Sequence, residues 1–517
     1  MAPFLCRFIP ERSARMSHPD PSTSPPTAGA PAPAQAPAQA LARYRPLFGT
    51  VVDDWDGFID SLCRPLGTCI WSRPGRIDGD ALAALLADQG VSSAPVSWLA
   101  EAPGIALALP PGFRAGQHWW YCAGLAHAQE AVSQLPVLAL GLAPGQRVLD
   151  LCAAPGGKTA QIALSLGNRG TVLANDFAMD RIAALQGNLD RLGVVNVSTT
   201  RYDGGNYPAA GPFDRILVDA PCSSEGTLRR NPGLVSKLGP ERSARMAGRQ
   251  RALLRKAVQL CRPGGRIVYS TCTFAPEENE LVVADVLAEQ QGRLRLRPAS
   301  AWAHLPGLVG GPGVTHWQGR PLPPALGGCL RLWPHANDTG GFFIAVLEKD
   351  AAAAGPPEPE PLAYEPAGED ADWCAGLAAH YGITEPVTAQ FRVHRQTRRG
   401  LHVAARDHAP PAAPQPEGSG LFFYRTNIRP PKLTTAGALL LGSQATRQVL
   451  DLDAPADRDA YLRRQTLQPS AAATAACRPG QVIIRHRGYP LGVAILHRSG
   501  ELESLFPRKW SGCTAAG

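Results

Sequence analysis

Several features that mark common protein classes are missing from the 517-residue chain. No apolar run reaches the roughly 20 residues that a membrane-spanning helix needs, which excludes a transmembrane protein. The twelve cysteines include no CxxC pair and no metal-like Cys/His spacing, which argues against a disulfide scaffold or a zinc module and favours a reducing cytoplasm. Lysine supplies only six of the 51 basic residues, so arginine carries the net charge of +8. This excess permits a polyanion partner, although GC-rich coding would produce the same arginine bias.

The first 42 residues have no features of a folded segment. The apolar stretch within residues 1–20 is short and is broken by charged residues and Pro10, which argues against a signal peptide. Residues 18–41 consist mainly of Pro, Ala, Ser and Gln, which bury too little apolar surface to offset the entropy of ordering. We expect a disordered tail over residues 1–42, with Met16 as an alternative start of translation.

The rest of the chain divides by its patterns into four parts. Residues 43–140 mix helical patterns with Pro/Gly breaks and predict a small α+β module. Residues 141–350 alternate strand and helix patterns, which predicts a parallel sheet with helices on both faces. Residues 351–372 carry six acidic residues and no basic one, which is typical of a solvated linker. Residues 373–517 end in strand-like pieces that predict a β-rich domain, and from residue 391 onward 18 basic residues face 8 acidic ones.

DLCAAPGGKTA, residues 150–160, predicts a strand that runs into a glycine-rich turn and then a helix. Gly156 and Gly157 would lie at the carboxyl edge of the sheet, where a ligand can approach a backbone without Cβ atoms. The turn has neither the GxGxxG spacing of dinucleotide sites nor the GxxxxGK[ST] spacing of nucleoside triphosphate sites, which disfavours both ligands. A purely structural turn is the alternative.

Two acidic residues follow the next two predicted strands. Asp176 ends the second strand, where a carboxylate can accept the hydroxyls of a ribose, and Asp203 ends the third, where it could meet an adenine edge. Either residue alone is more often a helix cap or a turn residue. Three strand ends in register favour a cofactor that contains a nucleoside.

The fourth and fifth predicted strands end in DAPC, residues 219–222, and STC, residues 270–272. Both place a cysteine at the carboxyl edge of the sheet, where such folds build their sites. A buried cysteine is usually an unreactive core residue, but two of them beside a nucleoside pocket indicate chemistry. The residues alone leave open whether Cys222 or Cys272 is the nucleophile.

Together these motifs resemble the RNA cytosine-5 methyltransferases of the NSUN/Sun/Fmu family, and within it the bacterial RsmF type. The resemblance covers about Arg64 to Lys349 and rests on DLCAAPGGKT, the two strand-end aspartates, DAPCSSEGTLRRNP and STCTFAPEENE. HAQEAVSQLP is similar to a short family motif that precedes the cofactor domain. The basic C-terminal region is similar to the PUA-like RNA-binding domain of RsmF-type enzymes.

The resemblance implies an α/β, Rossmann-like S-adenosylmethionine-dependent methyltransferase fold between an N-terminal RNA-binding module and a C-terminal PUA-like domain. By the family's pattern Cys272 is the nucleophile and Cys222 assists product release. A thiolate that adds to C6 of cytosine makes C5 electron-rich enough to accept a methyl group, and we expect Asp219 to hold the base edge. The resemblance assigns the cofactor to Cys152, Ala153, Ala154, Pro155, Gly156, Gly157, Lys158, Asp176, Asp203 and Asp219.

The function expected from this resemblance is methylation of a cytosine in 16S ribosomal RNA by a cytoplasmic monomer without membrane or metal. Arg229 and Arg230 follow the DAPC motif and are expected to reach a bound RNA strand, unless they belong to a solvated helix face. A tRNA-directed enzyme remains an alternative because the motifs are shared. An RNA-binding assembly factor without turnover is a second alternative, against which both cysteines argue, and a metabolite methyltransferase is a more distant one. Naked RNA and an assembled subunit both remain open as substrates.

Overall fold

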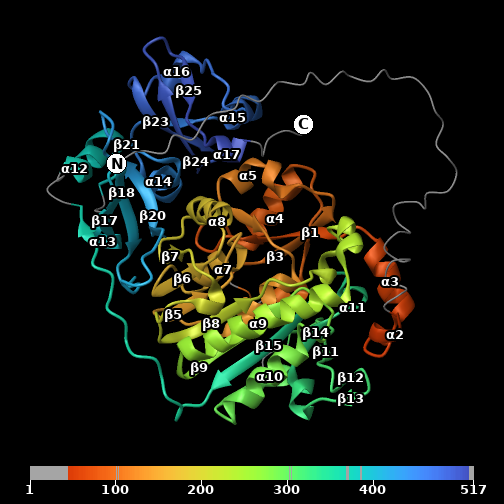
Figure 1. Ribbon diagram of the computed structural model, residues 1–517. Coiled ribbons are helices and arrows are strands. Elements are labelled where there is room, and N and C mark those ends of the chain that lie inside the picture. The colour runs from red at the N-terminus through yellow and green to blue at the C-terminus, as the bar shows by residue number, and fades with distance from the viewer. Residues whose placement is uncertain are drawn as a thin grey trace, which may run out of the picture.

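The computed structural model of the protein describes residues 45–511, with gaps at 101, 103, 302, 304, 368–371 and 385–386. Residues 1–42, predicted to be a disordered tail, lie outside the described residues. A helix-covered sheet occupies the middle of the molecule, and the C-terminal strands and helices, coloured cyan to blue, lie along its upper left side (Figure 1). None of the described helices is both long enough and apolar enough to cross a membrane.

The centre of the molecule is a ten-stranded mixed sheet. Five of its strands are parallel in the order β7-β6-β5-β8-β9, and β15 runs antiparallel beside β9. Most residues of these strands are buried, because helices cover both faces of the sheet. The parallel α/β sheet predicted from the sequence is confirmed. Its strands are β5 (Arg147–Asp150), β6 (Thr171–Asn175), β7 (Val197–Thr200), β8 (Phe213–Asp219), β9 (Cys261–Thr271) and β15 (Phe342–Lys349).

Successive side chains along the strands enter two different hydrophobic cores. Val148 packs with one set of helices and Leu149 with the other, since neighbouring strand residues point to opposite faces. The first core contains α6 (Leu135–Leu140), α7 (Gly157–Ser165) and α8 (Met179–Leu192). The second contains α9 (Pro240–Leu260) and α10 (Glu280–Gln290).

The N-terminal part is built on a four-stranded antiparallel sheet in the order β2-β3-β1-β4. Buried arginines fasten it to α8. Arg73 Nε donates a hydrogen bond to Leu192 O, and the Arg191 guanidinium donates to the carbonyls of Tyr121 and Ala126. The elements are α2 (Arg45–Phe48), α3 (Trp55–Cys63), β1 (Gly67–Ser72), α4 (Gly79–Asp88), β2 (Ala94–Pro95), β3 (Ala106–Pro111), α5 (Trp119–Cys122) and β4 (Ala126–Ala128).

Between α10 and β15 the chain adds short strands and one helical turn. Within this segment Arg331 forms an ion pair with Glu280 at 2.5 Å, and both side chains are almost completely buried. Arg331 also donates to Phe274 O at 2.9 Å. The elements are β10 (Leu294–Arg297), β11 (Gly311–Pro312), β12 (His316–Trp317), β13 (Arg320–Pro321), β14 (Leu330–Leu332) and α11 (Pro334–Asn337).

The C-terminal region contains two small sheets, in the orders β16-β17-β18-β20-β21 and β22-β23-β24-β25. Six helices accompany them, so the region is less purely β than the sequence pattern indicated. The strands are β16 (Glu365–Pro366), β17 (Phe391–Thr397), β18 (Gly400–Ala405), β20 (Leu421–Arg425), β21 (Lys432–Leu433), β22 (Val449–Asp451), β23 (Gly480–His486), β24 (Tyr489–Leu496) and β25 (Leu502–Ser504). The helices are α12 (Asp372–Tyr381), α13 (Val387–Gln390), α14 (Thr435–Leu441), α15 (Pro455–Leu462), α16 (Ala471–Thr474) and α17 (Arg508–Ser511).

This C-terminal region is joined closely to the rest of the protein. The short strand β19 (Gly418–Ser419) pairs with β7 and extends the central sheet. Ser198 Oγ on β7 lies 2.8 Å from both His408 Nε2 and Ser419 Oγ. Trp120 of the N-terminal part shares a hydrophobic core with Phe506. The acidic side chains in the described part of the predicted linker are exposed, as a solvated segment requires, but the chain returns at β16 to pair with β17.

We predict that Arg331→Met lowers the free energy of unfolding by about 3–5 kcal/mol, because it leaves the Glu280 carboxylate buried and unpaired. Urea denaturation followed by tryptophan fluorescence measures this change. Arg255→Met is the matched control, since Arg255 pairs with Glu289 on the surface, and it should cost less than about 1 kcal/mol. Equal losses in the two variants would contradict the role given to burial.

Candidate active site

The carboxyl ends of the parallel strands meet at one edge of the central sheet, and the turn from β5 into α7 lies there. Gly156 has φ +104°, and a Cβ atom on it would lie 2.7 Å from Leu185 Cδ1. A Cβ on Gly157 would lie 3.2 Å from His127 Nε2. Gly156 is favoured by its left-handed backbone, and a side chain on Gly157 would require His127 or Gln129 to shift by a few tenths of an ångström.

A cavity of about 330 Å³ lies against this turn. The predicted residues Cys152, Ala153, Ala154, Pro155, Gly157, Lys158 and Asp219 all line it. The opposite wall comes from the N-terminal part through Tyr121, His127, Gln129 and Glu130. The HAQE motif was singled out in the sequence, but Tyr121 and His127 were given no role. Both lie more than twenty residues before the glycine turn, and nothing in the sequence indicates that they face it.

Asp150 is a second lining residue that the sequence analysis left without a role. One carboxylate oxygen accepts a hydrogen bond from Thr159 Oγ1 at 2.7 Å, and the other, Oδ1, is buried near the Cys152 backbone and accepts no hydrogen bond of good geometry from the described residues. Burial raises the pKa of this carboxyl to about 7. An unpaired buried acceptor is costly unless a ligand donates to it, so Asp150 marks a place for a cationic or N–H group. Its position at a strand end, like that of Asp176, was the available signal.

Asp176 and Asp203 lie near the turn but do not line the cavity. The Asp176 carboxylate is buried and accepts from Ala154 N at 3.3 Å and from Arg181. Asp203 is exposed and caps the 3-10 helix η4 (Gly204–Asn206), accepting from Gly205 N. Asp203 therefore plays the capping role that the sequence offered as the alternative to a cofactor contact.

Asp219, at the end of β8, is held from two sides. Lys158 Nζ donates to one carboxylate oxygen at 2.7 Å, and Ser270 Oγ donates to the other at 2.8 Å. The register of the parallel pair places Asp219 directly beside Ser270 on β9. The cavity and the loops that follow β8 and β9 therefore meet at this carboxylate.

The two predicted catalytic cysteines lie together, with 3.4 Å between the sulfur atoms of Cys222 and Cys272. Cys222 is buried and Cys272 is partly exposed. The hydrogen bond from the Cys222 thiol lowers the pKa of Cys272, and the same contact raises the pKa of Cys222. The thiolate is therefore favoured on Cys272, the residue that is also the more accessible.

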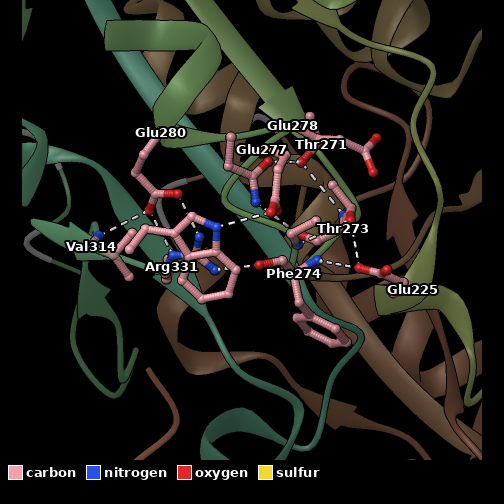
Figure 2. Close-up of polar contacts among 12 residues, drawn as sticks. Glu225, Thr271, Thr273, Phe274, Glu277, Glu278, Glu280, Val314 and Arg331 are labelled. Carbon is pink, nitrogen blue, oxygen red and sulfur yellow. Dashed lines mark hydrogen bonds and ion pairs between the residues drawn. The ribbon is translucent and has the colours of Figure 1, made fainter. Parts of the chain in front are cut away.

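A buried hydrogen-bond network fixes the two cysteine loops to each other (Figure 2). Glu225, three residues after Cys222, accepts from Thr273 Oγ1 at 2.6 Å and from Phe274 N at 3.0 Å. Glu278 accepts from Ser223 N at 3.0 Å. Burial raises the pKa of Glu225 to about 7, because desolvation disfavours the charged carboxylate. Buried hydrogen bonds of this kind hold together the segments that they connect.

The structure corrects the prediction for Arg229 and places Arg230 at the surface. Arg229 was expected to reach RNA, but only 1% of its side chain is exposed. Its guanidinium donates to the carbonyls of Arg64, Pro65 and Thr339 and pairs with Asp338 at 2.6 Å. Arg229 therefore anchors the loop. Arg230 is exposed and lines the cavity.

Among the described residues, no group of three or more His, Cys, Asp or Glu side chains is arranged to hold a metal ion. The donors gathered at this edge of the sheet are instead thiols, single carboxylates and backbone groups of the turn. This set suits an organic ligand in the cavity and nucleophilic chemistry at the cysteine pair.

Comparison with known proteins identifies the family. Residues 137–348 match the sequence model described as 16S rRNA methyltransferase RsmB/F. Curated proteins named Ribosomal RNA small subunit methyltransferase F, from Salmonella paratyphi C and Erwinia tasmaniensis, are 39% and 35% identical over 313 residues. These matches cover 59% and 60% of this chain, and the chain spans only 62% of the length of each relative.

A solved structure supports the same grouping. The structure described as Methyltransferase Homolog Protein from Pyrococcus horikoshii is 30% identical, with a TM-score of 0.51. The match covers 62% of this chain and 99% of that chain. The chain therefore belongs to the RsmB/F methyltransferase family.

Proposed function

We propose that the protein methylates C5 of a cytosine in 16S ribosomal RNA, with S-adenosylmethionine as methyl donor and through a covalent bond between Cys272 and C6 of the base. The observation that carries the proposal is the pair of cysteine sulfurs, 3.4 Å apart, at the ends of adjacent parallel strands. The names of the curated relatives support the choice of RNA. The N-terminal part and the basic C-terminal region would contact the RNA outside the active site.

The residues around the cavity fit this methyl donor. Its methionine ammonium group would meet the unpaired oxygen of Asp150, and the turn from Cys152 to Lys158 would hold it through backbone groups. Asp176 and Asp203 remain our assignments for the ribose and adenine. When bound, S-adenosylmethionine supplies an electrophilic methyl group on a sulfonium.

Cytosine C5 is a weak nucleophile, so the chain's own residues must raise its electron density. The Cys272 thiolate, favoured by the hydrogen bond from Cys222, would add to C6 and form a C–S bond. The electron pair released from the C5–C6 double bond then moves toward N3 and makes C5 nucleophilic. Asp219 would accept the cytosine amino N–H, exchanging one of its present donors for the base. Holding the reactants in line can contribute roughly 7–11 kcal/mol to lowering the barrier.

Product release requires two bonds to break after methyl transfer. The C5 proton must leave, and its electron pair re-forms the double bond as the C6–S bond breaks. Cys222 either takes this proton or positions the base that does. In both cases its proximity to Cys272 stabilises the departing thiolate, because a hydrogen bond to that sulfur favours the anion.

We expect Cys222→Ala to accumulate a covalent adduct between protein and RNA, because addition to C6 remains possible and elimination is slowed. Cys272→Ala should form neither adduct nor methylated product. Denaturing gel electrophoresis with labelled RNA, together with methyl incorporation from labelled S-adenosylmethionine, measures both outcomes. Cys261→Ala is a suitable control, since this buried cysteine begins β9 far along the strand from the site. Methylation by Cys272→Ala would overturn the assignment of the nucleophile.

The hydrogen bond between the cysteines also predicts a pH effect. A lowered pKa means that the Cys272 thiolate forms at lower pH, so removing the donor should move its titration to higher pH. Alkylation of Cys272 by iodoacetamide, followed by peptide mass spectrometry across a pH series, should therefore be half-complete at higher pH in Cys222→Ala than in the wild type. The Cys477 peptide should titrate identically in both proteins. An unchanged curve for Cys272 would show that Cys222 does not activate it.

The role given to Asp150 predicts a loss of cofactor affinity. Asp150→Asn keeps the shape of the side chain but removes the charge, and it should weaken S-adenosylmethionine binding roughly tenfold or more by isothermal titration calorimetry. Asp285→Asn, an exposed carboxylate on α10 at the opposite face of the sheet, should bind as the wild type does. Wild-type affinity in Asp150→Asn would remove Asp150 from the site.

A further inference from the structure

A second and larger hollow, of about 750 Å³, lies between α8 and the C-terminal region. We call it the α8 groove. One wall is α8, with Gln186 and Asp190, and the other contains β20, β21 and the start of α14. Pro507 and the first three residues of α17, Arg508 to Trp510, lie at its edge. In Figure 1, α14 and β20 lie next to α8, and both are in contact with that helix.

The α8 groove is strongly basic. Among the described residues that line it, four are cationic and Asp190 is the only acidic one. Arg425, Lys432 and Lys509 form no ion pair with any other described residue, and Arg425 and Lys509 are exposed. Unpaired cations along a groove between two walls are the arrangement that binds a phosphate backbone.

Asp190 is the feature that a phosphate site does not explain. Its carboxylate has no hydrogen-bond or ion-pair partner among the described residues, the residue is partly exposed at the groove, and desolvation raises its pKa to about 7. It also lies in the last turn of α8, where the helix dipole disfavours a negative charge. A carboxylate kept in such a place without a partner calls for a ligand that donates hydrogen bonds to it.

Two aromatic side chains complete the groove. The Arg425 guanidinium lies 5.5 Å from the centre of the Phe422 ring. The Trp510 indole N–H forms no hydrogen bond with the other described residues, and the ring is partly exposed. Aromatic rings and arginine planes of this kind stack unpaired bases in RNA-binding proteins.

We propose that the α8 groove binds an unpaired guanosine of the RNA substrate, with Asp190 accepting hydrogen bonds from the guanine edge and the cations contacting the flanking phosphates. Guanine presents two adjacent donors, N1–H and the 2-amino group, which match the two oxygens of one carboxylate. Uracil presents one N–H between two carbonyls, which a carboxylate repels. The proposal rests on the proposed function in taking RNA as the ligand.

The groove and the cofactor cavity are connected through α8. Asn188 lines the cavity beside the glycine turn, and Asp190 on the same helix lines the groove. Arg191, the next residue, donates to His127 in the cavity wall at 2.7 Å. An RNA segment bound in the groove would therefore lie on the element that also borders the cofactor site, and the groove would help to select which RNA segment reaches the cysteines.

Fluorescence anisotropy of the full chain, without cofactor, tests the proposal directly. The probe is a labelled single-stranded oligouridine with one central guanosine, and its partner probe carries inosine there, which lacks the 2-amino group. The wild type should bind the guanosine probe roughly tenfold more tightly, as expected for one lost hydrogen bond to a charged group. Asp190→Asn should abolish this preference, whereas Asp180→Asn, an exposed carboxylate on the same helix, should preserve it.

The cations have a different signature. Lys432→Ala and Lys509→Ala should weaken both probes equally and reduce the dependence of affinity on salt concentration. Arg498→Ala removes an exposed arginine of the same region outside the groove and should change neither. A thermal melt checks that each variant is folded. If Asp190→Asn does not fold, the two lysine variants still test whether the groove binds RNA.

Three results would overturn the proposal: equal wild-type affinity for the two probes, a guanosine preference that survives Asp190→Asn, or wild-type affinity in both lysine variants. The last would also be found if a protein partner, and not RNA, occupied the groove. Methyl transfer is measured separately on ribosomal RNA. Absent methylation with an intact guanosine preference would contradict the proposed function alone, and normal methylation without the preference would contradict the groove alone.

Discussion

The parallel pairing of β8 with β9 places Asp219 beside Ser270, and both cysteine loops start from that point. The loops would be free to separate if only this pairing held them. Buried hydrogen bonds that Glu225 and Glu278 accept across the loops prevent this and keep the sulfurs of Cys222 and Cys272 3.4 Å apart. The contact with Cys222 lowers the pKa of Cys272, so the chemistry that we propose depends on the backbone geometry of these two loops.

The cavity beside the glycine turn depends on a contact between parts of the chain that are distant in sequence. One wall is the glycine turn, and the other is the segment around His127, which the N-terminal sheet presents. Arg191 and Arg73 hold that sheet against α8 through buried hydrogen bonds. The C-terminal region adds a strand to the same central sheet through β19 and shares a core with Trp120. The N-terminal and C-terminal regions are therefore packed firmly against the central sheet, and the N-terminal part supplies one wall of the cavity.

The parallel sheet and the position of the site at its edge could be predicted because buried parallel strands form apolar runs and chemistry-bearing residues follow their ends. Arg229 could not be assigned correctly, since a buried anchoring arginine and an RNA-contacting one look alike in sequence. The pairing of β19 with β7 could not be predicted, because a strand of two residues is too short to show an alternating pattern. Asp150 and Asp190 stand out only when their surroundings and hydrogen-bond partners are known, because an acidic residue at a strand or helix end is ordinarily a cap.

The central claim is that Cys272 modifies a cytosine of the small-subunit ribosomal RNA. Bisulfite sequencing of that RNA tests it most directly, in cells that carry the gene, lack it, or carry Cys272→Ala in its place. We expect a cytosine that resists conversion only where the wild-type protein is present. Resistance that persists without the gene or with Cys272→Ala, or an RNA in which the wild-type protein protects no cytosine, would contradict it.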